Sequence, residues 1–487
     1  MSSQAAPAPP LSGRGAAITV VAQAVARGIT LFVILGSTAI VTRTVGVGVY
    51  ADWVTALSLM AMAGYLLDPG ITPVIVRRLV QDPNSSPRPR SMLAVRLVLG
   101  VVAALFVTAM TWALRGSDAL LLGAVRGAQL IPRSVVMNAG AWLQADQRLH
   151  RQTALEAVVA ALGLGSLAIA AALDAGAETL AAVGFLVPAL LLAVLMTGQL
   201  RRTPSAALPP HAPQRPRIRS VLKEVAPLAA SLIFVTVYTR IDVVFVNAAV
   251  GAEQVAAYLF AFQFIEQLIV LGAIVGAAVL PLMAARAKQV EPFGDKVTHD
   301  LLVGLAATGA LGSLVLIALA EPLTRIVGGP DLANAAEPLA LLAPTGVVLL
   351  VAIPLGTVYL ALGLGRRYLH FNAFALLFNI AANAALTLPF GIDAAARITW
   401  ATELAVAAAA SLPLWRGDAG ARRTVLALTG LIALVVACSE VVVVAGVDAR
   451  IAAAVGIVLT LAFTGRRLQW MLRAIRRPTA QPESAAS

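Results

Sequence analysis

The feature of this chain that most constrains its fold is a long series of apolar runs. Fourteen stretches each reach about 20 apolar residues, the length at which an α-helix crosses the hydrocarbon core of a bilayer. Backbone exposed to lipid must satisfy its hydrogen bonds within its own segment, so each run is predicted to be a helix. The runs lie near 17–42, 50–70, 92–114, 119–145, 153–173, 179–200, 224–248, 254–283, 298–320, 337–364, 369–389, 398–415, 422–445 and 449–465. The sequence therefore predicts an all-α polytopic membrane protein with about 14 transmembrane helices.

The composition supports this class and excludes others. Hydrophobic residues make up 59% of the 487 residues and charged residues 12%, about half the roughly 25% of an ordinary globular domain. The single cysteine excludes a disulfide framework. We therefore exclude a soluble enzyme, a disordered scaffold and a disulfide-built secreted protein. The first apolar run is too long for the core of a cleaved signal peptide and is predicted to be an uncleaved signal-anchor.

The basic residues predict the orientation in the membrane. If the N-terminus lies in the cytoplasm, 26 of the 36 Lys and Arg residues fall in loops or tails on the cytoplasmic side, and five fall on the outer side. Cytoplasmic loops carry an excess of Lys and Arg, so this asymmetry predicts that both termini are cytoplasmic. We expect a multi-pass protein of a bacterial cytoplasmic (inner) membrane, whose loop charges contact anionic headgroups and no nucleic acid.

A hydrophilic segment at 201–223, rich in Pro and Arg, divides six predicted spans from the next six. We predict that it is a flexible cytoplasmic linker. A shift of 208 residues places Tyr50 on Tyr258 and Pro73 on Pro281, which suggests an internal repeat of the kind found in secondary transporters. The expected organisation is two pseudo-repeated six-helix lobes around a central cavity, plus a C-terminal helix pair. Its predicted parts are a disordered tail at 1–16, an N-lobe at 17–200, the linker, a C-lobe at 224–415, the extra helix pair at 416–465 and a basic cytoplasmic tail at 466–487.

The motifs of several enzyme classes are missing from the sequence. No P-loop is present, because the dipeptide Gly-Lys does not occur, and neither H-E-x-x-H nor a cysteine pair suggests a metal site. The predicted outer connections are short, and the longest, 321–336, is too small for a catalytic domain. We therefore expect a transporter without cofactor or metal. A membrane glycosyltransferase or polymerase is the alternative from another class.

Four arginines within the apolar runs are the sharpest candidates for a binding site. Arg27, Arg126, Arg133 and Arg240 lie inside predicted spans, where a charged group costs about 3 kcal/mol and tends to face a cavity or a partner. Guanidinium groups bind phosphate in bidentate geometry. The four side chains therefore predict a water-filled cationic cavity that holds an anion.

Two mid-span carboxylates, Asp242 and Glu266, are too few to neutralise four arginines. Two interpretations of these carboxylates stay open. They bind a proton or cation that couples to transport, or they only pair with arginine, for example Glu266 with Arg240.

Polar side chains accompany these charges. Gln23 precedes Arg27 by one helical turn, and Gln129 lies on the helical face that carries Arg126 and Arg133, so we expect both glutamines to line the cavity. Asn379 and Asn383 form a polar stripe on one helical face. We expect that they line the cavity as well, or that their amides tie neighbouring helices together.

A fifth in-span arginine, Arg96, lies near the cytoplasmic end of its span. We expect its long side chain to extend to the headgroups.

Two stretches of the sequence resemble a known family. The first begins at Gly46 with G-V-G-V-Y and ends in L-L-D-P-G-I-T-P-V-I-V-R-R, and the second begins Y-T-R-I-D-V-V-F-V-N and continues to L-P-L-M-A-A-R. Both resemble the polysaccharide-transporter family of O-antigen and exopolysaccharide flippases, in the superfamily that also holds lipid II flippases and multidrug efflux antiporters. The matching positions are Gly46, Tyr50, Asp68, Gly70, Arg240, Asp242, Gly251, Tyr258 and Pro281. Pro69 stands where the family usually has a larger apolar residue.

The resemblance implies alternating access that moves a polyprenyl-diphosphate-linked oligosaccharide from the cytoplasmic to the outer leaflet. It also implies two lobes arranged in a V shape. The diphosphate of the implied substrate is the anion that an arginine-rich cavity would hold. The expected partners are this lipid-linked substrate, membrane lipids and polysaccharide polymerase or assembly proteins. A lipid II flippase and a multidrug/cation antiporter remain alternatives within the superfamily, and a non-catalytic scaffold remains one outside it.

Overall fold

The computed structural model describes residues 13–68, 70–81, 88–146, 148–202, 218–268, 296–361 and 365–476. Every regular element within these ranges is a helix, which confirms the predicted all-α class. Most of the predicted N-terminal tail, most of the linker at 201–223, the end of the basic tail and Pro281 lie outside the described residues.

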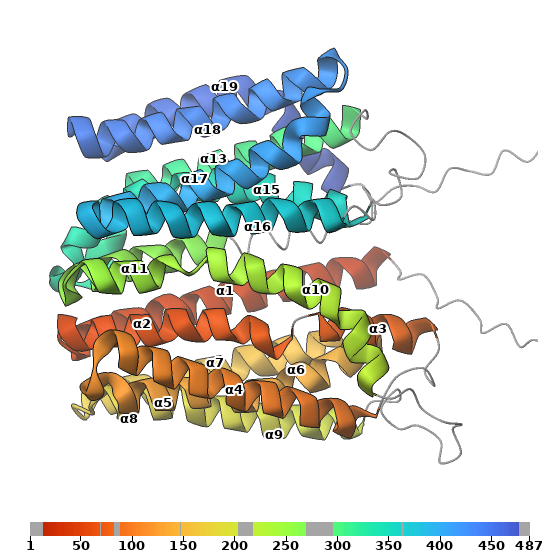
Figure 1. Cartoon of the computed structure of the whole chain (residues 1–487), viewed down its shortest axis with the longest axis vertical. Helices are drawn as coiled ribbons and strands as arrows, with labels where there is room; N and C mark the ends of the chain where they lie inside the picture. Colours follow the sequence, from red (N-terminus) through yellow and green to blue (C-terminus); the bar gives the residue numbers. More distant parts are fainter. Residues whose placement is uncertain are drawn as a thin grey trace, which may run out of the picture.

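The N-terminal half of the chain forms one helical bundle, shown in red to yellow in Figure 1. Helix α4 packs against α5 and α6, α1 packs against α7, and α6 packs against α9. We call this unit the N-bundle. Its elements are α1 (Gly13–Thr44), α2 (Val47–Gly64), η1 (Tyr65–Leu67), α3 (Ile71–Gln81), α4 (Pro89–Arg115), η3 (Ser117–Ala119), α5 (Leu120–Ala128), α6 (Leu130–Ala145), α7 (Leu149–Ala172), α8 (Ala177–Ala181), η4 (Ala182–Leu186) and α9 (Val187–Arg201).

The following residues form a second bundle, the C-bundle, which lies beside the first (Figure 1). Helix α13 packs against α15, and α17 packs against α15 and α16. The elements are α10 (Ile218–Tyr238), α11 (Asp242–Ala249), the helix 252–268, α13 (Lys296–Leu323), η6 (Thr324–Gly328), η7 (Pro330–Ala335), α14 (Ala336–Leu342), α15 (Pro344–Ala361), α16 (Gly365–Ala382), η8 (Asn383–Thr387) and α17 (Leu388–Trp415). Helix α10 starts inside the segment predicted as linker.

Two further helices, α18 (Ala419–Ala445) and α19 (Ala449–Arg476), lie on the outside of the C-bundle (Figure 1). Both pack against α13. The Arg397 guanidinium on α17 donates to both carboxylate oxygens of Glu440 on α18, at 2.9 Å each. Helix α19 continues past residue 465, where the helix pair was predicted to end, through the first half of the predicted basic tail.

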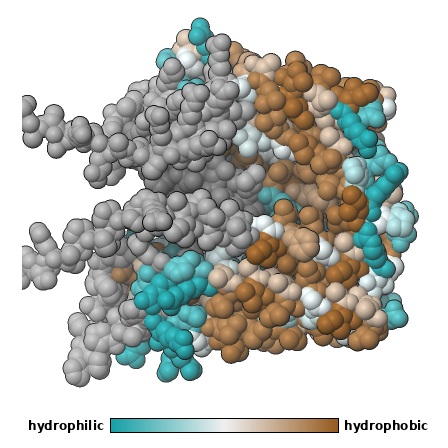
Figure 2. Space-filling model, turned by 180° about the vertical axis from the view of Figure 1, so that it is seen from behind, coloured by the Kyte–Doolittle hydropathy of each residue, from teal (hydrophilic) through white to brown (hydrophobic). Residues whose placement is uncertain are grey.

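Membrane crossing follows from length and hydropathy. Among the described residues, eight helical segments are long and apolar enough to span a bilayer, and a pair bent by 43° at Ala343 makes a ninth. Two shorter apolar helices, Gly28–Thr44 and Ala449–Gly465, accompany them. Figure 2 shows hydrophobic side chains over the middle of one face and hydrophilic ones at its right edge. The chain is a multi-pass membrane protein, and the count of 14 spans stays a prediction.

Two backbone breaks shape the C-bundle. The segment Arg366–Trp415 is one continuous helical run of 50 residues, but Gly391 within it has φ of 67° and ψ of −148°. Helices α16 and α17 pack on each other, and Asn379 donates to Thr402 across the bend, so the chain reverses at Gly391 and the run is a helical hairpin. The second break separates α10 from α11 at 239–241, so the predicted span at 224–248 is interrupted at Arg240.

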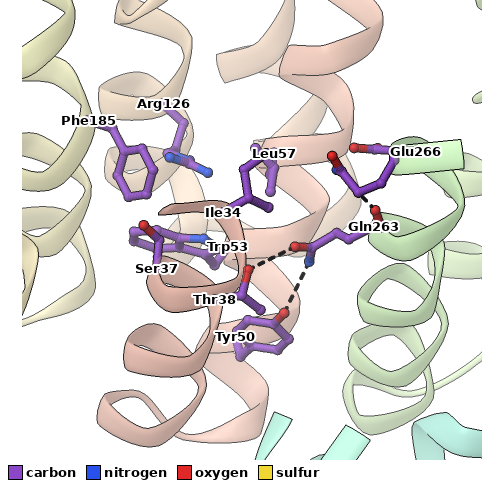
Figure 3. Close-up of a pocket in the computed structure, with 11 residues that line it drawn as sticks. Ile34, Ser37, Thr38, Tyr50, Trp53, Leu57, Arg126, Phe185, Gln263 and Glu266 are labelled. Carbon is purple, nitrogen blue, oxygen red and sulfur yellow. Dashed lines mark hydrogen bonds between the residues drawn. The ribbon is translucent and has the colours of Figure 1, made fainter. Parts of the chain in front are cut away.

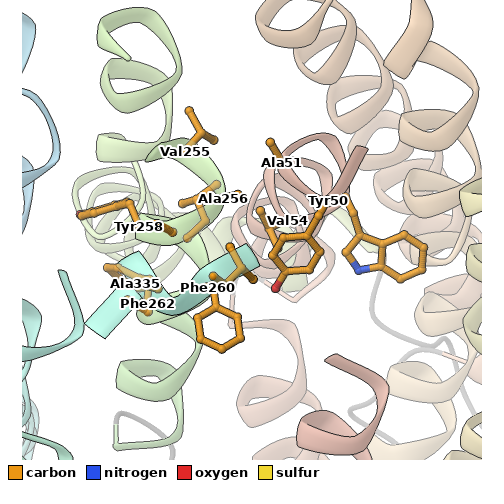
Figure 4. Close-up of a cluster of buried hydrophobic side chains, with 14 of the residues drawn as sticks. Tyr50, Ala51, Val54, Val255, Ala256, Tyr258, Phe260, Phe262 and Ala335 are labelled. Carbon is orange, nitrogen blue, oxygen red and sulfur yellow. The ribbon is translucent and has the colours of Figure 1, made fainter. Parts of the chain in front are cut away.

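The bundles meet near their predicted outer end through a continuous apolar cluster. Helix α2 contributes Tyr50, Ala51 and Val54, and the helix 252–268 contributes Val255 to Ile265, as Figure 4 shows for part of the set. The rings of Tyr50 and Phe260 meet edge to face at 6.5 Å. Tyr50 and Tyr258, the pair that the 208-residue shift superposes, are both buried, but Tyr50 packs at the bundle interface and Tyr258 is directed into the C-bundle (Figure 4).

The bundles also meet at the predicted cytoplasmic end. Glu224 on α10 forms ion pairs with Arg77 and Arg78 on α3, at 2.6 Å for Arg78. The start of α10 also packs in an apolar cluster with α3 and α6 that includes Trp142 and Val221. The structure therefore has contacts between the bundles at both ends.

Candidate functional site: two cavities at and beside the bundle interface

A cavity of about 150 Å³ lies between the two bundles, and we call it the Arg126 cavity. Five elements enclose it: α1, α2, α5, η4 and the helix 252–268 (Figure 3). Its lining residues are Ile34, Ser37, Thr38, Tyr50, Trp53, Leu57, Arg126, Phe185, Gln263, Glu266 and Gln267. The N-bundle therefore supplies most of the wall, and the C-bundle supplies three polar side chains.

Arg126 is the most unusual group in this cavity. Its side chain is only 1% exposed, and its guanidinium carbon lies 4.5 Å from the Trp53 ring centroid and 4.7 Å from that of Phe185. Figure 3 shows the guanidinium beside these two rings. Cation–π contacts of this kind stabilise a desolvated cation by about 2 kcal/mol. No carboxylate among the described residues pairs with Arg126, and its Nε and Nη1 atoms have no hydrogen-bond partner.

A hydrogen-bonded side chain joins the bundles at the edge of the Arg126 cavity. Gln263 Nε2 donates to Tyr50 Oη at 3.2 Å, and Thr38 Oγ1 donates to Gln263 Oε1 at 3.1 Å (Figure 3). The amide of Gln263 thereby bonds to both α1 and α2. A movement of one bundle relative to the other at this level has to break these bonds.

Arg240 has a different environment. Its guanidinium forms an ion pair with Glu266 and lies 4.6 Å from the Phe262 ring centroid. The pairing that the sequence left open for Arg240 and Glu266 is therefore the one that the structure shows. Arg240 occupies the break between α10 and α11 and does not line the Arg126 cavity, whereas Glu266 does.

A second cavity, of about 520 Å³, lies within the N-bundle, and we call it the Arg133 cavity. Its lining residues are Thr30, Met60, Gln129, Leu130, Arg133, Val136, Met137, Gln152, Glu156, Ala189 and Leu192. Arg133 is exposed, and no ion-pair partner for it exists among the described residues. Gln152 Nε2 donates to Glu156 Oε1 at 2.8 Å, which fixes the carboxylate of Glu156 on α7.

The two cavities occupy successive turns of the same helices. On α1, Thr30 lines the Arg133 cavity and Ile34 the Arg126 cavity, four residues apart. On α2, Met60 lines the Arg133 cavity and Leu57 the Arg126 cavity, three residues apart. Residues three or four apart lie on one helical face, so the Arg133 cavity adjoins the Arg126 cavity on the side of the predicted cytoplasmic end.

The remaining predicted carboxylate, Asp242, is buried in the C-bundle. Tyr258 Oη donates to Asp242 Oδ2 at 2.6 Å and lies 3.3 Å from Thr399 Oγ1. A nearby small cavity of about 20 Å³ is lined by Tyr238, Asn379, Thr399, Thr402 and Glu403, among others. Glu403 is a buried carboxylate that accepts a hydrogen bond from Tyr238.

The asparagine stripe belongs to this C-bundle network. Asn379 donates to Thr402 on α17 at 2.9 Å, and Asn383 donates to Asn379 Oδ1 at 3.0 Å. Asn383 is fully buried and lines none of the three cavities. The predicted polar stripe is therefore divided. Gln129 lines the N-bundle cavity, Asn379 bonds to the neighbouring helix α17, and Asn383 bonds to Asn379 and Thr387 within its own helical run.

The prediction for Arg96 is wrong. Its side chain is fully buried instead of reaching the headgroups, and its Nη2 atom donates to Thr72 Oγ1 at 2.7 Å and pairs with Asp68 at 3.3 Å. Asp68 also accepts a hydrogen bond from the Thr72 backbone N–H at 2.8 Å, as a cap of α3. Gly70 has φ of 97°, a conformation that favours glycine. The family-type positions Asp68 and Gly70 thus build the turn into α3.

Some predicted positions carry no side-chain description. The side chains of Gln23 and Arg27 lie outside the described ones, although both residues belong to α1. Arg27 precedes Thr30, which lines the Arg133 cavity, by three residues, a little less than one helical turn.

Sequence reasoning missed four residues of these sites. Trp53 and Phe185 flank Arg126, but aromatic residues inside apolar runs carry no distinguishing signal. Glu156 and Glu403 are carboxylates inside apolar runs and satisfy the criterion that selected Asp242 and Glu266.

Known families match the chain over much of its length. The model of the polysaccharide biosynthesis protein family matches residues 12–286, and the MatE model matches residues 227–385. No curated protein matches the chain in sequence.

Solved structures share the fold at low sequence identity. The structure of lipid II flippase MurJ in an inward closed conformation has a TM-score of 0.65 at 13% identity and covers 93% of this chain and 100% of its own. An inward-facing multidrug resistance MATE family transporter of the MOP superfamily has a TM-score of 0.59 at 13% identity, covering 82% and 94%. A Vibrio cholerae MATE transporter, VcmN, in the bent form has a TM-score of 0.53 at 12% identity, covering 85% and 97%. The chain has the fold of MOP-superfamily flippases and transporters, and it belongs to the polysaccharide biosynthesis protein family.

Proposed function

We propose that the protein is a flippase that moves a polyprenyl-diphosphate-linked oligosaccharide from the cytoplasmic to the outer leaflet by alternating access. The observation that carries this proposal is Arg126, a buried guanidinium with unpartnered donors in a cavity between two bundles. An uncompensated buried cation is costly unless a ligand or water satisfies it, so the cavity favours an anion. A diphosphate offers the acceptor oxygens that guanidinium donors require.

The arrangement of contacts also supports alternating access. The Arg126 cavity lies at the interface of the two bundles, between the apolar cluster near the predicted outer end and the Glu224 ion pairs at the predicted cytoplasmic end. Opening one end and closing the other by rigid-body movement exposes the same cavity to each side in turn. Arg27 would add a further positive charge near the middle of α1.

The roles of the acidic residues follow from their partners. We propose that Glu266 keeps Arg240 neutralised, so that Arg240 contributes less to substrate binding than Arg126 and Arg133 do. Asp242 and Glu403 lie together in the polar network of the C-bundle and are candidates for proton or cation coupling. In this proposal the N-bundle holds the substrate and the C-bundle responds to the coupling ion.

The likeness to lipid II flippase MurJ supports a second candidate, lipid II itself, which is also a lipid diphosphate carrying sugars. A multidrug/cation antiporter is less well supported, because uncompensated arginine in the Arg126 cavity repels a cationic substrate. A membrane glycosyltransferase requires catalytic groups that the cavities do not assemble among the described residues.

The experiment that tests the proposal is depletion of the protein in its host. Lipid-linked sugar intermediates are then extracted, and the leaflet in which they reside is measured by their access to an external reagent. Build-up in the cytoplasmic leaflet is the expected result, and accumulation of the peptidoglycan precursor would select the lipid II alternative. Accumulation of unpolymerised units in the outer leaflet would indicate a polymerase and contradict the proposal.

A further inference from the structure

The Arg133 cavity differs in chemistry from the Arg126 cavity. In the Arg126 cavity, the charged group without a partner is a cation whose Nε and Nη1 donors are free. The Arg133 cavity holds both a free cation, Arg133, and a carboxylate, Glu156, with no ion pair between them among the described residues. It therefore presents a strong donor and a strong acceptor to the same space.

The carboxylate is held in place by its neighbours. Gln152 donates to Glu156 at 2.8 Å, and Gln152 Oε1 is buried against α6, where a Cβ added to Gly140 would lie 2.5 Å from it. Gly140 therefore leaves the room that Gln152 needs to hold Glu156. A carboxylate fixed in this way repels phosphate and acidic sugars and accepts hydrogen bonds from hydroxyl groups.

The size and place of the cavity narrow the ligand further. Its volume of about 520 Å³ is in the range of small-molecule sites, about 300–1,000 Å³, whereas the Arg126 cavity is much smaller. Arg126 and Arg133 are seven residues apart along α5 and α6, which corresponds to about 10 Å at the rise of an α-helix. A diphosphate joined to a sugar ring spans a distance of this order.

The order of the two cavities matches a lipid in the cytoplasmic leaflet. In such a lipid the sugar lies on the cytoplasmic side of the diphosphate, and the Arg133 cavity lies on the predicted cytoplasmic side of the Arg126 cavity. Hydroxyl and acetamido groups both donate and accept hydrogen bonds, so a neutral sugar satisfies Arg133 and Glu156 together, while a phosphate satisfies only the arginine.

We infer that the Arg133 cavity is the subsite for the sugar attached to the diphosphate, that it takes a neutral hydroxyl- or acetamido-bearing ring, and that Glu156 selects against acidic sugars. This inference rests on the proposed function, because it assigns the Arg126 cavity to the diphosphate. Neither Glu156 nor Gln152 touches the Arg126 cavity, so the two assignments can be tested separately.

The test is binding to the purified full-length protein of two probes, undecaprenyl diphosphate alone and undecaprenyl diphosphate carrying one N-acetylglucosamine. The wild type is expected to bind the sugar-bearing probe about tenfold or more tightly than the bare diphosphate. This ratio corresponds to the free energy of one hydrogen bond to a charged group. Glu156→Gln removes most of that difference without weakening the binding of the bare diphosphate. Arg126→Gln weakens the binding of both probes.

Two further variants separate a sugar contact from a structural effect. Gly140→Ala displaces the Gln152 amide and is expected to act like a weaker Glu156→Gln, again without weakening the binding of the bare diphosphate. Glu178→Gln, a matched change on α8 outside both cavities, leaves both affinities as in the wild type.

A wild type that binds both probes equally tightly overturns the sugar subsite and leaves the proposed function standing. Equal weakening of both probes by Glu156→Gln also overturns the subsite. A wild type that binds neither probe overturns the proposed function and the subsite with it.

Discussion

Both bundles are built from packed helices, but their buried charged side chains have different partners. In the N-bundle, Arg126 lies between two aromatic rings with free donors, and Arg133 faces a cavity without an ion-pair partner among the described residues. In the C-bundle, Arg240 is paired with Glu266, and Asp242 is bonded to Tyr258. Paired charges hold helices together, whereas unpaired ones are kept at a cost in stability that a ligand offsets.

We assign different tasks to the two bundles. In the proposed function, the free positive charge of the N-bundle binds the anionic substrate. The C-bundle carries a hydrogen-bonded polar network, which includes the Asn379–Thr402 bond across the Gly391 hairpin. Arg96 also lies in the N-bundle but is paired with Asp68. The role of a buried arginine therefore follows from whether it has an ion-pair partner and not from its bundle.

The largest effect is expected at Arg126. Arg126→Gln removes the free buried cation, so substrate transport should fall by about a hundredfold, the loss expected for charge-assisted bonds to an anion. The same change removes an unpartnered buried charge, so thermal stability in detergent should stay equal or rise. Transport in proteoliposomes and a thermal unfolding curve measure the two effects.

The matched control for that variant is Arg450→Gln, which neutralises an exposed arginine at the start of α19. It should change neither transport nor stability. A second variant, Ser37→Asp, keeps Arg126 and adds a carboxylate to the wall of the Arg126 cavity. It should also abolish transport. Normal transport by Ser37→Asp would contradict the need for uncompensated charge.

The next effect is expected in the C-bundle. Glu266→Gln leaves Arg240 buried without its carboxylate, which should lower the free energy of unfolding by about 3 kcal/mol. The double variant with Arg240→Gln should recover most of this loss. As a matched pair, the exposed Arg325 and Glu321 should contribute less than about 1 kcal/mol, so Glu321→Gln should leave the unfolding curve almost unchanged.

A smaller loss of stability is expected at the turn into α3. Asp68→Asn leaves the buried Arg96 without a charged partner but keeps the Thr72 contact, so we expect a loss of about 2 kcal/mol. Binding of the bare diphosphate lipid should be unchanged, because Arg96 lines neither arginine cavity. A loss of binding with unchanged stability would place Arg96 among the binding arginines instead.

The smallest effect is expected at the contact between the bundles near the predicted cytoplasmic end. Glu224 and its arginine partners are partly exposed, so Glu224→Gln should shift the conformational equilibrium by only about 0.5–1 kcal/mol. Spin labels on α3 and α10, in a background where Cys438 is replaced, measure the distance between the bundles. The longer distance should become more populated, and an unchanged distribution would show that these ion pairs do not hold the bundles together.

Much of the fold could be predicted from the sequence, because apolar length alone forces helices in a membrane. The Arg240–Glu266 pairing was also accessible, since few carboxylates lie within the apolar runs. The placement of Arg126 and Arg133 in separate cavities was not, because it depends on the rotation of α5 and α6 about their axes. The Phe185 contact was equally inaccessible, since it depends on the path of η4, far away in sequence.

The Arg96 error has an equally physical cause. The side chain lies near a span end, where lysine and arginine usually extend to the interface. Asp68, 28 residues earlier in the sequence, lies at the turn that contains Gly70, and its carboxylate is a closer partner for Arg96 than the headgroups are. Such pairing across a turn has no local signal in the sequence.

In the proposed function, the free positive charge in the N-bundle binds the anionic lipid while it crosses the membrane. The most direct test reconstitutes the wild type and Arg126→Gln in vesicles loaded with undecaprenyl diphosphate-linked N-acetylglucosamine, and follows the fraction of sugar that an external lectin reaches. We expect rapid exchange between leaflets for the wild type, and exchange near that of protein-free vesicles for the variant. Equal exchange by both proteins, at equal incorporation, would contradict a role for Arg126 in binding the lipid.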